Sequence, residues 1–150
     1  VPLGFVTSGL LKVYFNTFHG NIYIKRFVGP NEFIGAYSSI IKDMPAHLNF
    51  QAIEDSILIQ FDTIQMRSII DENMSFQVMA RKIAEFYFCE REDKELSQLT
   101  EDATTRYQRF LKQYAHFQDR IAQKDIAFYL GITPVALSRI RQKICKINLD

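Results

Sequence analysis

The sequence predicts an α+β fold in which an antiparallel barrel or roll is followed by a long helix and a helical carboxy-terminal domain. Five of the six glycines and three of the four prolines lie in residues 1–45, where β-branched and aromatic residues alternate with polar ones. From residue 63 onward only one glycine and one proline remain, and apolar residues recur at helical spacings. We therefore divide the chain into residues 1–72, 73–97 and 98–150.

The composition is that of an ordinary folded protein. The chain has 150 residues, of which 47% are hydrophobic and 23% charged, so disordered, collagen-like and disulfide-stapled classes are excluded. No apolar run approaches the roughly eighteen residues that a transmembrane helix needs, and we expect no membrane partner. Cys89 and Cys145 lie far apart without metal-ligand spacing, so we expect two free thiols in a reducing cytoplasm and no metal site.

The amino-terminal part is predicted to consist of strands. Residues 11–15 and 22–27 read as a hairpin whose loop carries His19 and Gly20, and a second turn follows at residues 29–31. Strand spacing of this kind is typical of a small antiparallel barrel or roll. The remaining elements expected here are a short helical turn at 36–42 and two strands at 49–53 and 56–62, joined at Glu54 and Asp55.

Two helices are predicted next. The first is short, is capped by Asp62 or Thr63 and runs to Ile70; the second spans about residues 73 to 96 and would be about 36 Å long. Its apolar stripe favours a self-association seam, and the alternative is a helix packed lengthwise on its own domain. The charged residues 90–95 are interpreted as a solvated, frayed end. The seam consists of Phe76, Met79, Ala80, Ile83, Phe86 and Tyr87.

The segment after residue 119 carries the most specific signal. A short helix ends at Leu130, Gly131 occupies the position after it, Thr133 can cap a second helix, and Pro134 can begin that helix at no cost in hydrogen bonds. The small Ala127 allows the two helices to approach closely, as helix-turn-helix geometry requires. We also expect a preceding amphipathic helix that starts after Thr100 and carries Arg106, Tyr107, Phe110, Leu111 and Tyr114.

The charge of this segment favours DNA as a partner. The whole chain has a formal charge of +1, but residues 120–147 hold six basic residues and one acidic residue, and residues 126–147 hold no acid. A solvated face of a plain helical hairpin, which is the alternative, would carry charges of both signs. The pattern therefore predicts that the second helix enters the major groove of double-stranded DNA.

Residues 126–141, which read IAFYLGITPVALSRIR, resemble the helix-turn-helix of the CRP/FNR family of bacterial transcription regulators. Residues 103–111 resemble the helix before that motif, and residues 8–15, 33–38 and 51–56 resemble the family's cyclic-nucleotide-binding-type roll. The resemblance implies a jelly-roll-like antiparallel β-roll, a long dimerisation helix and a winged-helix-type helix-turn-helix domain. It also implies a cytoplasmic homodimer that binds a palindromic DNA site and contacts RNA polymerase, and a roll whose first strands and leading helix precede Val1.

The resemblance also assigns residues to DNA. Ser138 and Arg139 match positions that contact DNA, and Arg139 is the best candidate for reading a guanine. Thr133 matches a phosphate-contacting cap. Val135 stands where many members have a Glu that reads cytosine, so we expect it to contact a thymine methyl and the target sequence to differ. The remaining DNA-binding candidates are Pro134 and the helix residues Arg141, Gln142 and Lys143, which we expect to touch phosphates or to keep the helix soluble.

The effector site departs from the family more strongly. Cyclic-AMP binders place a Glu after the glycine that Gly35 matches and an Arg after the short helix, but this chain has Ala36 and Ala46 there. A buried phosphate without its cation is costly, which argues against cyclic AMP and leaves the cofactor unidentified. His47 is a weak substitute for the arginine because it is mostly neutral near pH 7. The candidate pocket residues are Gly35, Ala36, Tyr37, Ser38 and His47.

Three classes of function compete. A dimeric DNA-binding transcription regulator with an effector-sensing or vestigial roll fits best, and an interaction or scaffold module that uses the same fold without binding DNA is the alternative. An enzyme is disfavoured because the sequence has no Gly-rich phosphate loop, nucleophile elbow or HExxH motif, and no catalytic residues are predicted.

Overall fold

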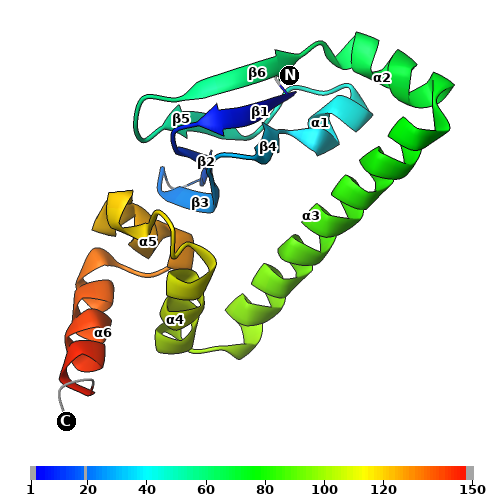
Figure 1. Ribbon diagram of the computed structural model, residues 1–150. Coiled ribbons are helices and arrows are strands. Elements are labelled where there is room, and N and C mark those ends of the chain that lie inside the picture. The colour runs from blue at the N-terminus through cyan, green and yellow to red at the C-terminus, as the bar shows by residue number, and fades with distance from the viewer. Residues whose placement is uncertain (1–2, 19, 148–150) are drawn as a thin grey trace.

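The computed structural model describes residues 3–18 and 20–147 of the chain, except for the side chains of residues 146 and 147. Figure 1 shows a β-roll at the upper left, a long helix that runs obliquely down the right side, and a helical domain below the roll. The α+β fold and the order of its parts are therefore as the sequence predicts.

The roll is built from two three-stranded antiparallel sheets. One has the order β4-β1-β6 and the other β3-β2-β5. The predicted hairpin is confirmed, since β2 pairs with β3 from Leu11 opposite Val28 to Asn16 opposite Ile22. Asn31 has a φ of 67°, which fits the predicted turn before β4. The strands are β1 (Leu3–Ser8), β2 (Leu11–Asn16), β3 (Ile22–Val28), β4 (Glu32–Gly35), β5 (Asn49–Ala52) and β6 (Ile57–Phe61).

The structure corrects two expectations about the roll. Strand β1 was not among the predicted strands, although it is the central strand of its sheet. Strands β5 and β6, predicted as neighbours joined by a turn, belong to different sheets, because β5 pairs with β2 and β6 with β1. Val6, Val13 and Ile34 are buried between the sheets, so the apolar faces of both sheets meet inside the roll.

The helices that leave the roll are capped by polar side chains. Asp62 accepts hydrogen bonds from the backbone of Ile64 and Gln65 at the start of α2 (Thr63–Glu72), and Asn73 accepts two more at the start of α3 (Met74–Thr100). Helix α3 has 27 residues and is about 40 Å long, so it continues through the segment interpreted as a frayed end. Its only buried residue among those described is Ser97. The short helix α1 (Tyr37–Lys42) lies in the roll, as expected.

The carboxy-terminal part is helical over its described residues. It contains α4 (Ala103–Gln113), the 3-10 helix η1 (Gln118–Arg120), α5 (Gln123–Leu130) and α6 (Pro134–Ile147). Its core is shared with the roll, because Leu10, Ile24 and Phe27 of the roll lie in one buried cluster with the core residues of the helices. The helical members of that cluster are Tyr107, Phe110, Tyr114, Ile121, Ile126, Ala127, Tyr129, Leu130 and Leu137.

The described residues contain two free cysteines, Cys89 and Cys145, both exposed, and no group of three or more residues placed to hold a metal ion. Among the helices that the structure describes, none combines the length and the apolar character needed to cross a membrane.

Candidate nucleic-acid interface

The turn between α5 and α6 has the local geometry that the sequence predicts. Gly131 is left-handed, with a φ of 70°, and its backbone N–H donates to the carbonyl of Ala127. Thr133 caps α6, since its hydroxyl accepts a hydrogen bond from the N–H of Ala136 at 3.1 Å. Pro134 is the first residue of α6. These features fix the angle at which α6 leaves α5.

Helix α6 packs firmly on the rest of its domain. Leu137 is 1% exposed and lies in the shared core, and Ile140 and Ile144 pack against that core from the same side of the helix. Ala127 of α5 is fully buried, which confirms the expected close approach. The inward side of α6 is thus anchored, and its outward side is presented rigidly.

The outward side of α6 carries the residues predicted to bind DNA. At 100° per residue, Val135, Ser138, Arg139 and Gln142 share one exposed face, and Arg141 and Lys143 flank it on opposite sides. Val135 is 62% exposed, so its side chain is accessible to a partner. Thr133 and Pro134, at the start of the helix, are exposed as well.

The basic side chains of this face are available to a partner. None of Arg139, Arg141 and Lys143 belongs to the ion pairs found among the described residues. Lys143 makes only the smallest contribution to the lowered pKa of Asp102, which is due first to the hydrogen bond from the backbone N–H of Thr105. The helix therefore presents positive charge that no ion pair among residues 3–18 and 20–147 neutralises.

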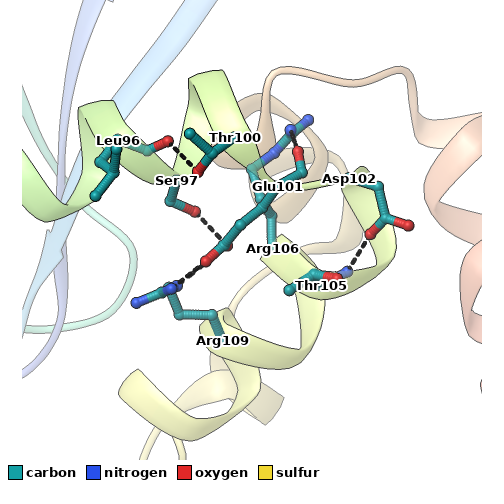
Figure 2. A network of polar contacts seen from close by, with 8 residues as sticks. All are labelled: Leu96, Ser97, Thr100, Glu101, Asp102, Thr105, Arg106 and Arg109. Atoms are coloured by element: carbon teal, nitrogen blue, oxygen red, sulfur yellow. Dashed lines mark hydrogen bonds and ion pairs between the residues drawn. The ribbon is translucent and has the colours of Figure 1, made fainter.

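A polar network at the junction of α3 and α4 orients this domain (Figure 2). The carboxylate of Glu101 accepts a hydrogen bond from the hydroxyl of Ser97 at 2.6 Å and pairs with Arg109. Arg106 donates to the backbone carbonyl of Glu101 at 2.6 Å and to that of Leu130, the last residue of α5, at 3.4 Å. The end of the long helix is thereby tied to both helices that precede the recognition helix.

The six predicted seam residues of α3 all line one wide groove between α3, the roll and α4. Phe76, Met79 and Phe86 are between 42% and 60% exposed, while Ala80 and Ile83 are half-buried. Tyr87 instead engages its own chain. Its hydroxyl accepts from the N–H of Phe33 at 3.2 Å, and the guanidinium of Arg26 lies 4.6 Å from its ring centre.

The effector candidates lie at the end of β4, at the start of α1 and just after it. Gly35 ends β4, and Ala36, which is 1% exposed, precedes α1, so a larger side chain has no open space there. Tyr37, Ser38 and His47 are exposed, and with Gly35 they line the same groove as the seam. The structure does not bring these five residues together into an enclosed site.

Two charged contacts between the roll and the helical domain were not foreseen. Lys12 of β2 pairs with Asp125 of α5 at 2.8 Å, and Lys94 of α3 lies 3.8 Å from the ring centre of Tyr129. Lys94 follows Tyr87 by seven residues, or about two helical turns, so the two residues lie on the same side of α3. This spacing was the feature of the sequence that could have predicted that Lys94 faces the rest of its own chain. No local pattern pairs Lys12 with Asp125, because they are 113 residues apart.

Comparison with known proteins finds matches to both the roll and the helical part of the chain. Residues 2–73 match the family model of the cyclic nucleotide-binding domain. Comparison with curated protein sequences gives no match. Among solved structures, FixK2 from Bradyrhizobium japonicum is similar with a TM-score of 0.82 at 18% identity, over 98% of this chain and 76% of FixK2.

Two further structures carry the family name. One is a putative transcriptional regulator of the CRP/FNR family from Eubacterium rectale, with a TM-score of 0.76 at 16% identity, over 94% of this chain and 68% of that one. The other is TTHB099, a CRP-family transcriptional regulator from Thermus thermophilus, with a TM-score of 0.76 at 14% identity, over 99% and 77%. Residues 2–73 thus match the model of the cyclic nucleotide-binding domain, and the chain shares the fold of the CRP/FNR regulators of known structure, as its sequence resemblance implied.

Proposed function

We propose that this chain is a sequence-specific DNA-binding transcription regulator of bacteria that acts as a cytoplasmic homodimer and contacts RNA polymerase. Residues 1–72 form its sensory or vestigial roll, 73–97 its dimerisation helix and 98–150 its DNA-binding domain. The observation that carries the proposal is the exposed face of α6, a helix anchored by Leu137, whose arginines form no ion pair within the described part of the chain. A scaffold module would have no need of such a face.

The composition of that face indicates how DNA is read. Arg139 lies on this exposed face and is the candidate for two hydrogen bonds to a guanine. Val135 lies one turn before Arg139 and offers a methyl surface suited to the methyl group of thymine. Thr133, Pro134, Arg141, Gln142 and Lys143 surround these two and fit contacts to the phosphate backbone.

The first experiment selects DNA sequences with the full chain and then compares Arg139→Ala with Arg141→Ala in gel-shift titrations over a range of salt. We expect Arg139→Ala to weaken binding to the selected site by about 1–3 kcal/mol and to relax preference at one base pair. Arg141→Ala should weaken binding to all sequences alike and lower the salt slope by about one. Equal affinity of Arg139→Ala and the parent protein for every sequence would remove Arg139 from the reading role.

The proposed dimer rests on the exposed apolar side of α3. A helix of 27 residues with one buried residue leaves much of the seam without cover. Phe76, Met79 and Phe86 are the residues whose exposure favours a second copy as the cover. Ala80 and Ile83 complete this surface, and Tyr87 lies at its edge.

The second experiment measures self-association by sedimentation at micromolar concentration. Ile83→Asp should place a charge in the interface and weaken the dimer roughly a hundredfold or more. Lys82→Asp is the matched control, because it adds the same carboxylate at an exposed position beside the seam. An Ile83→Asp protein that is as dimeric as the control would show that α3 is not the main interface.

The effector is proposed to be something other than cyclic AMP. The buried Ala36 and the alanine at position 46 provide neither a ribose acceptor nor a cation for a cyclic phosphate. Titration of cyclic AMP against the full chain by calorimetry tests this, and we expect no saturable heat.

A further inference from the structure

A single lysine stands where the long helix, the roll and the helical domain meet. Lys94 of α3 donates hydrogen bonds to two backbone carbonyls of β3, that of Ile24 at 3.0 Å and that of Lys25 at 2.6 Å. Its nitrogen also lies 3.8 Å from the ring centre of Tyr129 in α5 and 4.9 Å from that of Tyr23 in β3. One side chain therefore bridges three elements that the sequence places far apart.

The surface on which this bridge stands is an extensive contact between the roll and the helical domain. The ring of Phe27 in β3 lies 5.4 Å from that of Tyr114 and 5.7 Å from that of Tyr129. Lys12 of β2 and Asp125 of α5, each with a side chain 13% exposed, close the other side of the contact. Helix α5, on which the recognition helix rests, is therefore docked on the roll.

We propose that Lys94 is a positioning residue that fastens α3 and the roll to α5, and that gain or loss of its proton changes how firmly the helix-turn-helix domain docks on the roll. The docking itself is independent of DNA. Its consequence for DNA affinity rests on the proposed function, because only a DNA-binding domain would be affected through its orientation.

The groups around Lys94 do not neutralise its charge. Strand β3 contributes the cations Lys25 and Arg26 together with the phenol of Tyr23, and α5 contributes the phenol of Tyr129. No carboxylate is among the groups that hydrogen-bond to Lys94 or shift its pKa. The other titratable groups near this junction are Glu90 and Arg91 of α3, Arg106 and Arg109 of α4, and Tyr114 directly after α4. They act on Tyr23, Lys25 and Tyr129.

This environment makes the amine sensitive to pH near neutrality. Burial, and then the charge of Lys25, lowers the pKa of Lys94 to about 7 from its ordinary value of 10.5. When the domain undocks, the amine returns to water and binds its proton more tightly. Docking therefore releases a proton between the two pKa values, and it becomes firmer as the pH rises through that window.

The size of the effect follows from the two pKa values. When the pH falls from about 8 to about 6, the equilibrium constant for undocking should increase about tenfold. The undocked amine is protonated over this whole range, whereas the docked amine changes from mostly neutral to mostly protonated. Below about pH 6 the amine is protonated in both states and the dependence flattens.

Hydrogen exchange of the full chain tests this without DNA. Amide exchange in α5 and β3, corrected for the intrinsic effect of pH, should show the tenfold change in the parent protein. Lys94→Met should abolish the dependence by removing the amine, and Lys94→Arg should abolish it because arginine stays charged. Lys82→Met, on the exposed side of the same helix, should keep it. The rest of the chain is the same in every variant, so the difference between variants isolates Lys94.

Two results would overturn the proposal: a parent protein without the dependence, or a Lys94→Met protein that retains it. Should both variants fail to fold, the titration of the Lys94 side-chain carbon by NMR in the parent protein decides, with a pKa near 7 expected and one near 10.5 contradicting it. If the parent protein shows the pH-dependent exchange but binds no selected DNA, the positioning role of Lys94 stands and the proposed function is rejected.

Discussion

The shared core between the roll and the helical domain leads to a quantitative prediction for Phe27→Ala. Phe27 belongs to the roll and is 1% exposed. Its ring contacts aromatic rings of α4 and α5, with centre distances of 6.1 Å to Phe110, 5.4 Å to Tyr114 and 5.7 Å to Tyr129. Removing the ring deletes a fully buried side chain at a point where surrounding rings from two elements cannot easily collapse.

The expected loss in the free energy of unfolding is about 3–5 kcal/mol, the usual cost of Phe→Ala in a core. For a chain of this length the melting temperature should fall by roughly 2–4 °C for each kcal/mol. Circular dichroism in urea gives the free energy at fixed protein concentration, since self-association would otherwise change it. Ile64→Ala is the control, because Ile64 is 80% exposed and its replacement should change stability by less than about 0.5 kcal/mol.

The location of the loss tests the reasoning more sharply than its size. If the roll and the helical domain form one cooperative unit, hydrogen-exchange protection must fall in α5 as much as in β3. A loss below about 1 kcal/mol, or a loss confined to the strands, would refute the idea that Phe27 ties the two parts into one core.

Three further predictions concern single positions. Asp125→Asn leaves the part-buried ammonium of Lys12 without its charged partner and should cost less than the roughly 3–5 kcal/mol of a fully buried pair in urea unfolding. The double change of Lys12 and Asp125 to apolar residues should recover much of that loss. Gly131→Ala meets no neighbouring atom, so any loss, expected at about 1–2 kcal/mol, measures the left-handed φ alone. Hydrogen bonds from Arg109 and then from Ser97 lower the pKa of Glu101. The α3–α4 junction should therefore be fully stable above the ordinary pKa range of a carboxyl group and should loosen as the pH falls through the lowered pKa. Glu101→Gln should remove this acid dependence of amide hydrogen exchange at the junction.

Local signals predicted the elements of the helical domain well. Gly131, Thr133 and Pro134 each impose a backbone requirement within one or two residues, so the ends of α5 and α6 follow directly from the sequence. The hairpin of β2 and β3 was likewise predictable, because its two strands are adjacent in the chain.

Such local signals do not predict which distant strands and side chains pair with one another. Strand β5 pairs with β2 and β6 with β1, and no alternation pattern states which strand lies beside which. The pairing of Lys12 with Asp125 depends on how the helical domain docks on the roll, which is decided by the whole shared core. Residues 90–95 are interpreted from their charge as a solvated run, although Lys94 within it continues the spacing of the seam and is covered by Tyr129.

The two ends of α3 serve different contacts. Near its amino end, Phe76 and Met79 are exposed and suited to a second copy, whereas further along Tyr87 binds β4 and Lys94 binds β3 and α5 of the same chain. A helix of 27 residues transmits a rotation or shift along its length because its backbone hydrogen bonds make it stiff. A change at the exposed seam would therefore reach Lys94 directly, and through it the helix on which the recognition helix rests.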